Sequence, residues 1–175
     1  MATKQKMITA VFRDRFAASA VYDWLLDQGY RPDEVNVLMT EKTRNAFRDE
    51  GDRGRISAGS KAPEGAATGG AVGAVVGATA AAIAAIGTSL VVPGLGWIVA
   101  GPVYAALAGG GAGAVAGGVI GALVGLGIPE SNATAYEEAL RNGGIVIGVV
   151  PRSSESGNKI EQEFENRKGE NIVWA

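Results

Sequence analysis

Residues 65–129 of this 175-residue chain contain no Asp, Glu, Lys or Arg, and this uncharged block constrains the fold more than any other feature. It holds 18 of the 27 glycines, whereas the parts before and after it carry charges of both signs. The middle of the chain therefore follows different packing rules from its ends. We divide the chain into residues 1–47, a charged linker at 48–64, the uncharged segment at 65–127 and residues 128–175.

Small residues recur at every fourth position along two arms of this block. They are Gly65, Gly69, Gly73, Gly77 and Ala81 in the first arm, and Gly101, Ala105, Gly109, Gly113, Gly117, Gly121 and Gly125 in the second. This spacing places them on one face of a helix, where small side chains allow a second helix to approach closely. Between the arms, residues 90–102 contain Pro93-Gly94 and predict a bend. We expect a Gly/Ala-rich helical hairpin that packs and self-associates through these twelve residues, a glycine zipper.

The two ends of the chain predict one α+β domain. Strands are expected at 6–12, 34–40, 145–150 and 171–175, because these runs are apolar and rich in β-branched residues. Helices are expected over 14–29, over 129–142 and over 158–169, the first with Asp14 as N-cap, Gly29 as its stop and Phe16 in its buried stripe. A further short helix is expected after Thr40, with Phe47 packed down. Two βαβ halves predict a ferredoxin-like fold, a four-stranded sheet with helices on one face, into which the hairpin is inserted.

Composition excludes several kinds of chemistry. The chain has no His and no Cys, which removes the usual zinc ligands, the Cys nucleophile and the Ser-His pair. No two carboxylates stand at a spacing that indicates acid–base catalysis. The glycine pattern at 111–117 resembles a dinucleotide-binding loop only loosely, since no strand precedes it and the spacing continues on both sides. We predict no enzyme activity, no catalytic residue, no cofactor and no metal. A net charge of −2 gives no attraction to nucleic acid.

The sequence allows two kinds of partner for the uncharged arms, membrane lipid and protein. A helix of about 25 residues is roughly 37 Å long and can cross a bilayer core of about 30 Å. Gly and Ala contribute little free energy to transfer into a membrane, however, and the mean hydropathy of the whole chain is only +0.13. The leading expectation is a homo-oligomer at or in the membrane, with the α+β domain in the cytoplasm because Arg53, Arg55 and Lys61 precede the first arm. The alternatives are a soluble cytoplasmic assembly that sequesters the hairpins, or a ligand-sensing regulatory domain.

Three short patterns carry a resemblance to a known family. They are the junction Gly127–Glu130, the pair Tyr136-Glu137 and the pair Gly143-Gly144 before an apolar strand, all following a glycine-rich middle. In this order the chain resembles the bacterial general stress or heat-induced stress proteins, to which low-temperature-induced proteins are related. The resemblance covers most of the chain apart from the linker. It implies a stress-associated role and no known catalytic residues.

Overall fold

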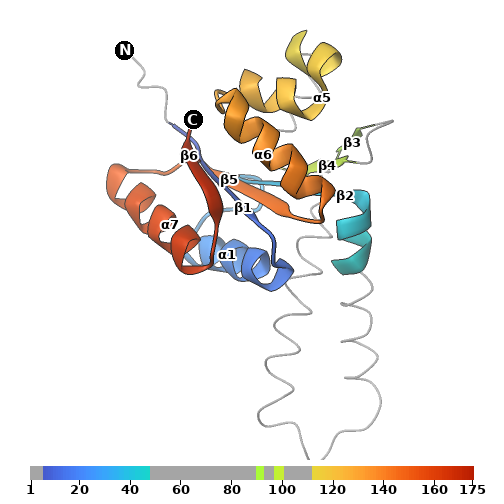
Figure 1. Ribbon diagram of the computed structural model, residues 1–175. Helices are drawn as coiled ribbons and strands as arrows, with labels where there is room; N and C mark the ends of the chain where they lie inside the picture. The colour runs from blue at the N-terminus through green and yellow to red at the C-terminus, as the bar shows by residue number, and fades with distance from the viewer. Residues whose placement is uncertain (1–5, 48–89, 93–96, 101–111) are drawn as a thin grey trace, which may run out of the picture.

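The computed structural model describes residues 6–47, 90–92, 97–100 and 112–175, which form one sheet with helices on both faces (Figure 1). The strands are β1 (Ile8–Phe12), β2 (Val35–Thr40), β3 (Leu90–Val92), β4 (Trp97–Ala100), β5 (Ile145–Val149) and β6 (Glu170–Trp174). The labelled helices are α1 (Arg15–Asp27), α5 (Ala112–Gly125), α6 (Glu130–Arg141) and α7 (Ser154–Asn166), and residues 41–47 are helical as well. The predicted α+β class is confirmed.

The strands are arranged so that the two ends of the chain share one sheet. Their order is β3-β4-β2-β5-β1-β6, and each neighbouring pair is antiparallel. Val149 of β5 lies opposite Ile8 of β1 on one side and opposite Val35 of β2 on the other. The ladder of β1 and β6 continues past both strands, because Met7 and Ala175 exchange two backbone hydrogen bonds of 2.7 and 2.8 Å. The two central strands, β1 and β5, therefore each pair with a strand from the other end of the chain.

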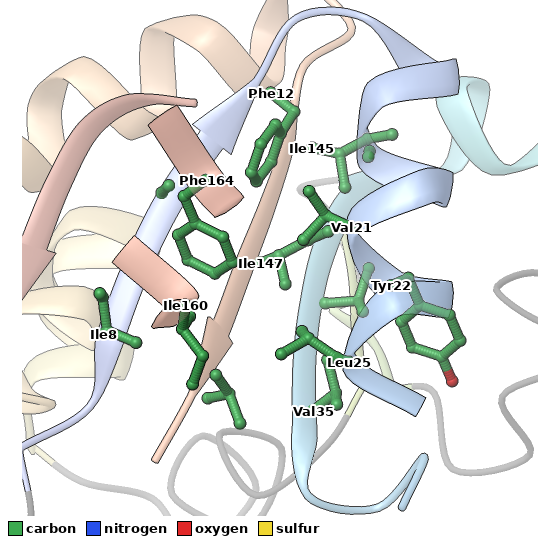
Figure 2. Packing of buried hydrophobic residues seen from close by; sticks show 14 of the residues in the cluster. Ile8, Phe12, Val21, Tyr22, Leu25, Val35, Ile145, Ile147, Ile160 and Phe164 are labelled. Carbon is green, nitrogen blue, oxygen red and sulfur yellow. The ribbon is translucent and has the colours of Figure 1, made fainter. Parts of the chain in front are cut away.

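One face of the sheet packs against α1 and α7. Alternate residues of the central strands point to this face, among them Ile8 and Phe12 of β1 and Ile145 and Ile147 of β5. Figure 2 shows them meeting Val21 and Leu25 from α1 and Ile160 and Phe164 from α7. The rings of Phe12 and Phe164 meet edge to face with their centroids 5.5 Å apart. This cluster is the main hydrophobic core.

The opposite face of the sheet is also covered, and this corrects the expectation of helices on one face alone. The remaining residues of the same strands, such as Val11, Leu38 and Val146, are buried against α5 and α6 (Figure 1). Leu140 of α6 and Leu123 of α5 are the helical side of this second cluster. All five residues of β1 and all five of β5 are consequently buried. A sheet whose strands are apolar on both faces needs two layers of helices.

The segment expected to be a bend between two helices forms a β-hairpin instead. β3 and β4 pair with each other, and β4 pairs with β2 with Val37 opposite Ala100. Val99 is buried in the second cluster beside Leu38. The runs on either side of Pro93-Gly94 are short and rich in β-branched residues, and β2 offers them a free edge. The uncharged block is thus part of the sheet, and not only an insertion into it.

The ends of the helices follow local capping chemistry. The carboxylate of Asp14 accepts a 3.0 Å hydrogen bond from the backbone N–H of Phe16, and Gly29 ends α1 with a positive φ of 84°, both as predicted. Thr40 caps residues 41–47 by accepting from the N–H of Thr43. Helix α7 begins at Ser154, earlier than predicted. Ser153 and Ser156 form a reciprocal capping box there, which the apolar spacing alone did not indicate.

Candidate functional site

Four of the twelve predicted small residues lie in the described part of the chain. Gly113, Gly117, Gly121 and Gly125 all belong to α5. The other eight lie outside the described residues: Gly65, Gly69, Gly73, Gly77, Ala81, Gly101, Ala105 and Gly109. Within the 65–127 segment, the structure describes β3, β4 and α5. The described part of the candidate self-association surface therefore lies on α5.

Helix α5 is interrupted at Gly118, which corrects the expectation of one continuous ladder from Gly101 to Gly125. The backbone of Gly118 has φ 58° and ψ −141°, a conformation that a side chain would make strongly unfavourable. Gly113 and Gly117 belong to the segment before this interruption, and Gly121 and Gly125 to the segment after it. Paired glycines such as Gly117-Gly118 are a common cause of sharp helix kinks. The four glycines do not form one straight face.

The second segment of α5 is packed on one side and uncovered on the other. Leu123 is 2% exposed, and Val119 and Ile120 pack against the same cluster next to α6. Val124 is 42% exposed, although it is a large apolar residue, and a Cβ placed on Gly125 would have no atom within 4 Å. A helix without charged residues normally has all its sides buried. This side of α5 is therefore apolar surface that the described chain leaves open.

The residues that carry the family resemblance have structural explanations. Gly127 follows α5 with φ 95°, and Pro129 immediately precedes α6. A Cβ on Gly144 would lie 2.8 Å from the carbonyl oxygen of Ala139, so the strand after α6 needs glycine at this close approach. These residues shape the α5–α6 and α6–β5 junctions.

Tyr136 of the same pattern anchors α6 to the sheet. Its buried hydroxyl donates to the backbone oxygen of Asn171 and lies 3.0 Å from the hydroxyl oxygen of Thr9. Burial raises the pKa of Tyr136 to about 12, against a smaller lowering by the hydrogen bond with Thr9. A phenol buried in this way joins α6, β1 and β6, and it remains protonated throughout the physiological range.

A hollow of about 580 Å³ lies between α1 and the end of α7, and we call it the α1–α7 hollow. Its lining includes Arg13, Asp14, Phe16 and Asp23 from the α1 side and Arg167, Lys168 and Glu170 from the chain after α7. Phe16 is 56% exposed, so its predicted place in the buried stripe of α1 is wrong. Ala18, Val21, Tyr22 and Leu25 define the buried stripe at helical spacing, and Phe16 lies outside it. That spacing was the signal in the sequence that could have placed this ring on the surface.

A smaller hollow of about 230 Å³ lies between the end of α1 and the start of α7, and Arg152 is one of the residues that line it. The guanidinium lies 4.5 Å above the ring of Tyr30, donates to the carbonyl oxygen of Gly29 at 2.7 Å and pairs with Glu34 at 3.1 Å. The pKa of Glu34 is lowered chiefly by the backbone N–H of Arg31, with Arg152 adding to the effect. Arg152 therefore links the start of α7 to the end of α1 by contacts within the chain.

In residues 6–47, 90–92, 97–100 and 112–175, no helix combines the length and apolar character needed to cross a membrane. The described residues also contain no group of three or more acidic side chains placed to hold a metal ion. No protein-family model, curated protein or solved structure matches this chain.

Proposed function

We propose that this protein is a non-enzymatic, stress-associated protein that self-associates through its uncharged Gly/Ala-rich segment, at or in the membrane. The observation that carries the proposal is the open side of α5. Val124 and Gly125 are uncovered there on a helix without a charged residue, while Leu123 holds the same helix against the sheet. Exposed apolar surface of this kind is typical of protein–protein or membrane contacts.

The α+β domain is the rigid support in this proposal. The order β6-β1-β5-β2, with α1 and α7 on one face, supports a ferredoxin-like domain built from two split βαβ halves. Parts of the uncharged segment contact this domain, since β4 pairs with β2, β3 pairs with β4, and Leu123 of α5 lies in the second cluster. Self-association of the segment would thus bring copies of the domain together at a fixed edge. The stress-associated role rests on the family resemblance alone.

The test is the native mass of the full chain, measured by light scattering with and without detergent. We expect the wild type to be an oligomer. The Gly113→Leu, Gly117→Leu, Gly121→Leu triple variant should be dissociated, because its helices no longer approach closely. Leu at these positions could also disturb the fold, so a second variant is needed. Val124→Lys changes an exposed side chain and should weaken association while leaving the circular dichroism spectrum unchanged. Thr134→Lys adds the same charge to an exposed site on α6 and is its control.

A stable wild-type monomer in the absence of detergent would overturn the proposal. A second candidate, a soluble particle with the segments enclosed, is favoured by the composition of the segment, because the Gly and Ala that make up most of it contribute little transfer energy to membrane insertion. Electron microscopy of protein purified without detergent separates the two candidates. Closed particles support the second, and protein that is recovered only with lipid or detergent supports the first.

A further inference from the structure

Asn142 and Gly143 at the end of α6 form an Asn-Gly pair, and the sequence contains this pair nowhere else. Asn is a thermolabile residue that hyperthermophilic proteins use less, because its amide is lost when the next backbone nitrogen attacks it. Glycine favours this attack, since it has no Cβ to obstruct its nitrogen. Asn142 is exposed, so water reaches its amide. The pair is therefore a candidate site of covalent modification.

Deamidation at this pair needs water and no other reactant. The nitrogen of Gly143 gives up its proton and bonds to Cγ of Asn142, while the Cγ–Nδ2 bond breaks and Nδ2 leaves as ammonia. Water then opens the resulting succinimide ring at one of its carbonyl carbons, and the nitrogen regains a proton. Opening at Cγ leaves Asp, and opening at the backbone carbon leaves isoaspartate. No atom is oxidised or reduced.

The turn after α6 keeps the reacting atoms of this pair apart. The backbone of Asn142 has φ −87° and ψ 12°. At a ψ near zero the nitrogen of Gly143 eclipses the nitrogen of Asn142, whereas ring closure requires it to eclipse Cβ, about 120° away around the Cα–C bond. The side chain is held as well, because Nδ2 of Asn142 donates to the carbonyl oxygen of Glu138 at 3.0 Å. Ring closure therefore requires a rotation about ψ.

Hydrogen bonds of the same turn resist this rotation. The N–H of Gly143 donates to the carbonyl oxygen of Leu140 at 2.9 Å, and the N–H of Gly144 donates to that of Ala139 at 2.8 Å. These are the two bonds of a Schellman motif. Rotation about ψ of Asn142 would break both bonds and move the start of β5. The reaction is consequently blocked as long as the turn is closed.

We propose that Asn142 is a deamidation site controlled by local opening of the turn between α6 and β5. The closed turn separates the reacting atoms, and the open turn allows the rotation about ψ. The product favours further opening. Asp in place of Asn142 brings a negative charge to the negative end of the α6 dipole and loses the donor to Glu138. The proposal rests on this turn and not on the proposed function.

Peptide mass spectrometry of the full chain measures deamidation at Asn142, at mildly alkaline pH with and without unfolding by guanidinium chloride. We expect the reaction to be slower in the native protein by about tenfold or more, because the turn is closed there. Asn158, which precedes Lys159, is the internal control and should remain largely intact in both conditions. Equal rates at Asn142 in the native and unfolded chains would overturn the proposal, as would an intact Asn142 in the unfolded chain.

Two glycine variants separate local opening from global unfolding. Gly144→Ala places a Cβ 2.8 Å from the carbonyl oxygen of Ala139 and leaves both reacting residues unchanged. We expect it to accelerate native deamidation about tenfold. Gly157→Ala creates an overlap with Trp174 at α7, on the opposite face of the sheet, and should leave the rate unchanged. An equal acceleration by both variants would show that global unfolding controls the reaction and would overturn the proposal.

Hydrogen exchange of the wild type provides a second measurement, which does not depend on the folding of Gly144→Ala. The amide proton of Gly143 exchanges when its hydrogen bond to Leu140 opens, so exchange and deamidation report the same event. Guanidinium chloride below the unfolding transition should increase both rates by the same factor. Faster exchange at Gly143 without faster deamidation would contradict the proposal.

Asn142→Asp tests the effect of the product. We expect its urea unfolding midpoint to shift to a lower concentration, because a negative charge is unfavourable at the end of α6. Asn132→Asp is the matched control in the first turn of the same helix, where a negative charge is favourable, and its midpoint should not fall. An unchanged or higher midpoint for Asn142→Asp would overturn the proposed effect of the product.

Discussion

Gly157 of α7 and Gly125 of α5 are both helical glycines, but their surroundings predict opposite responses to alanine. A Cβ on Gly157 would overlap Cη2 of Trp174, lie 2.9 Å from its Cζ3 and come within 3.3 Å of Pro151. A Cβ on Gly125 would enter open space. Replacement of glycine by alanine within a helix stabilises it by about 1 kcal/mol, and by less at the last position of a helix such as Gly125.

For Gly125→Ala we therefore expect a gain of about 0.5 kcal/mol in the free energy of unfolding. For Gly157→Ala two costs oppose the stabilisation that alanine gives a helix. Overpacking against the rigid indole ring costs about 1–3 kcal/mol. Further packing is lost when Trp174 moves away from the main hydrophobic core. The expected result is a loss of about 1–2 kcal/mol. The two variants should differ by roughly 2 kcal/mol in opposite directions.

Urea unfolding followed by circular dichroism, at one protein concentration, measures both changes. Trp174→Phe supplies the decisive background, because the ring atoms that approach Gly157 belong to the part of the indole that Phe lacks. In that background the overpacking is relieved and Gly157→Ala should become stabilising by about 1 kcal/mol, which gives a coupling energy of about 2–3 kcal/mol. A cost that persists without the indole, or a stabilising Gly157→Ala variant in the wild-type background, would show that the reasoning from the Cβ contacts is wrong.

Four further predictions address the other anchors of the fold. Tyr136→Phe should lower the free energy of unfolding by about 1–3 kcal/mol, and a cycle with Thr9→Val should show coupling, because the hydroxyl pair is buried. The pKa of Tyr136 is raised to about 12 in the folded state, so the free energy of unfolding of the wild type should fall by about 2–3 kcal/mol as pH rises from about 10 to 12. Tyr136→Phe should lose less over the same range. Urea unfolding at a series of pH values measures both changes. Lys168 has φ 60°, so Lys168→Gly should raise the melting temperature by relieving up to about 1 kcal/mol of backbone strain, and an unchanged value would exclude strain there. Ser153→Ala should cost about 1 kcal/mol in urea unfolding by removing the cap of α7, while Ser154→Ala, outside the capping box, should cost little.

The strands and helices at the two ends of the chain could be predicted because their signals are local. The sequence predicts strands at 6–12 and 34–40, and the structure has β1 over Ile8–Phe12 and β2 over Val35–Thr40. Asp14 and Gly29 set the ends of α1 through contacts with their immediate neighbours. The kind of element and the approximate bounds therefore depend on a few adjacent residues.

The second layer of helices, the hairpin β3–β4 and the kink at Gly118 could not be predicted in the same way. Each depends on a distant part of the chain, or on a choice among conformations that the local residues all allow. β3 and β4 form where β2 has a free edge for β4 to pair with. The hydrophobic periodicity of residues 90–100 does not show that this edge exists. Gly117-Gly118 permits a kink but does not require one. Of the candidate site, α5 could be named in advance, whereas its open side depends on which residues α6 covers.

The two hydrogen bonds between Met7 and Ala175 place the ends of the described fold next to each other. A circular permutation can therefore join Ala175 to Met7 through a short linker and open the chain within the uncharged block. In such a protein the charged ends become one contiguous domain, α6-β5-α7-β6-β1-α1-β2, and the block becomes a pair of tails. Shortening those tails one element at a time would measure how much of the sheet's stability comes from β3 and β4, without breaking the connection between its central strands.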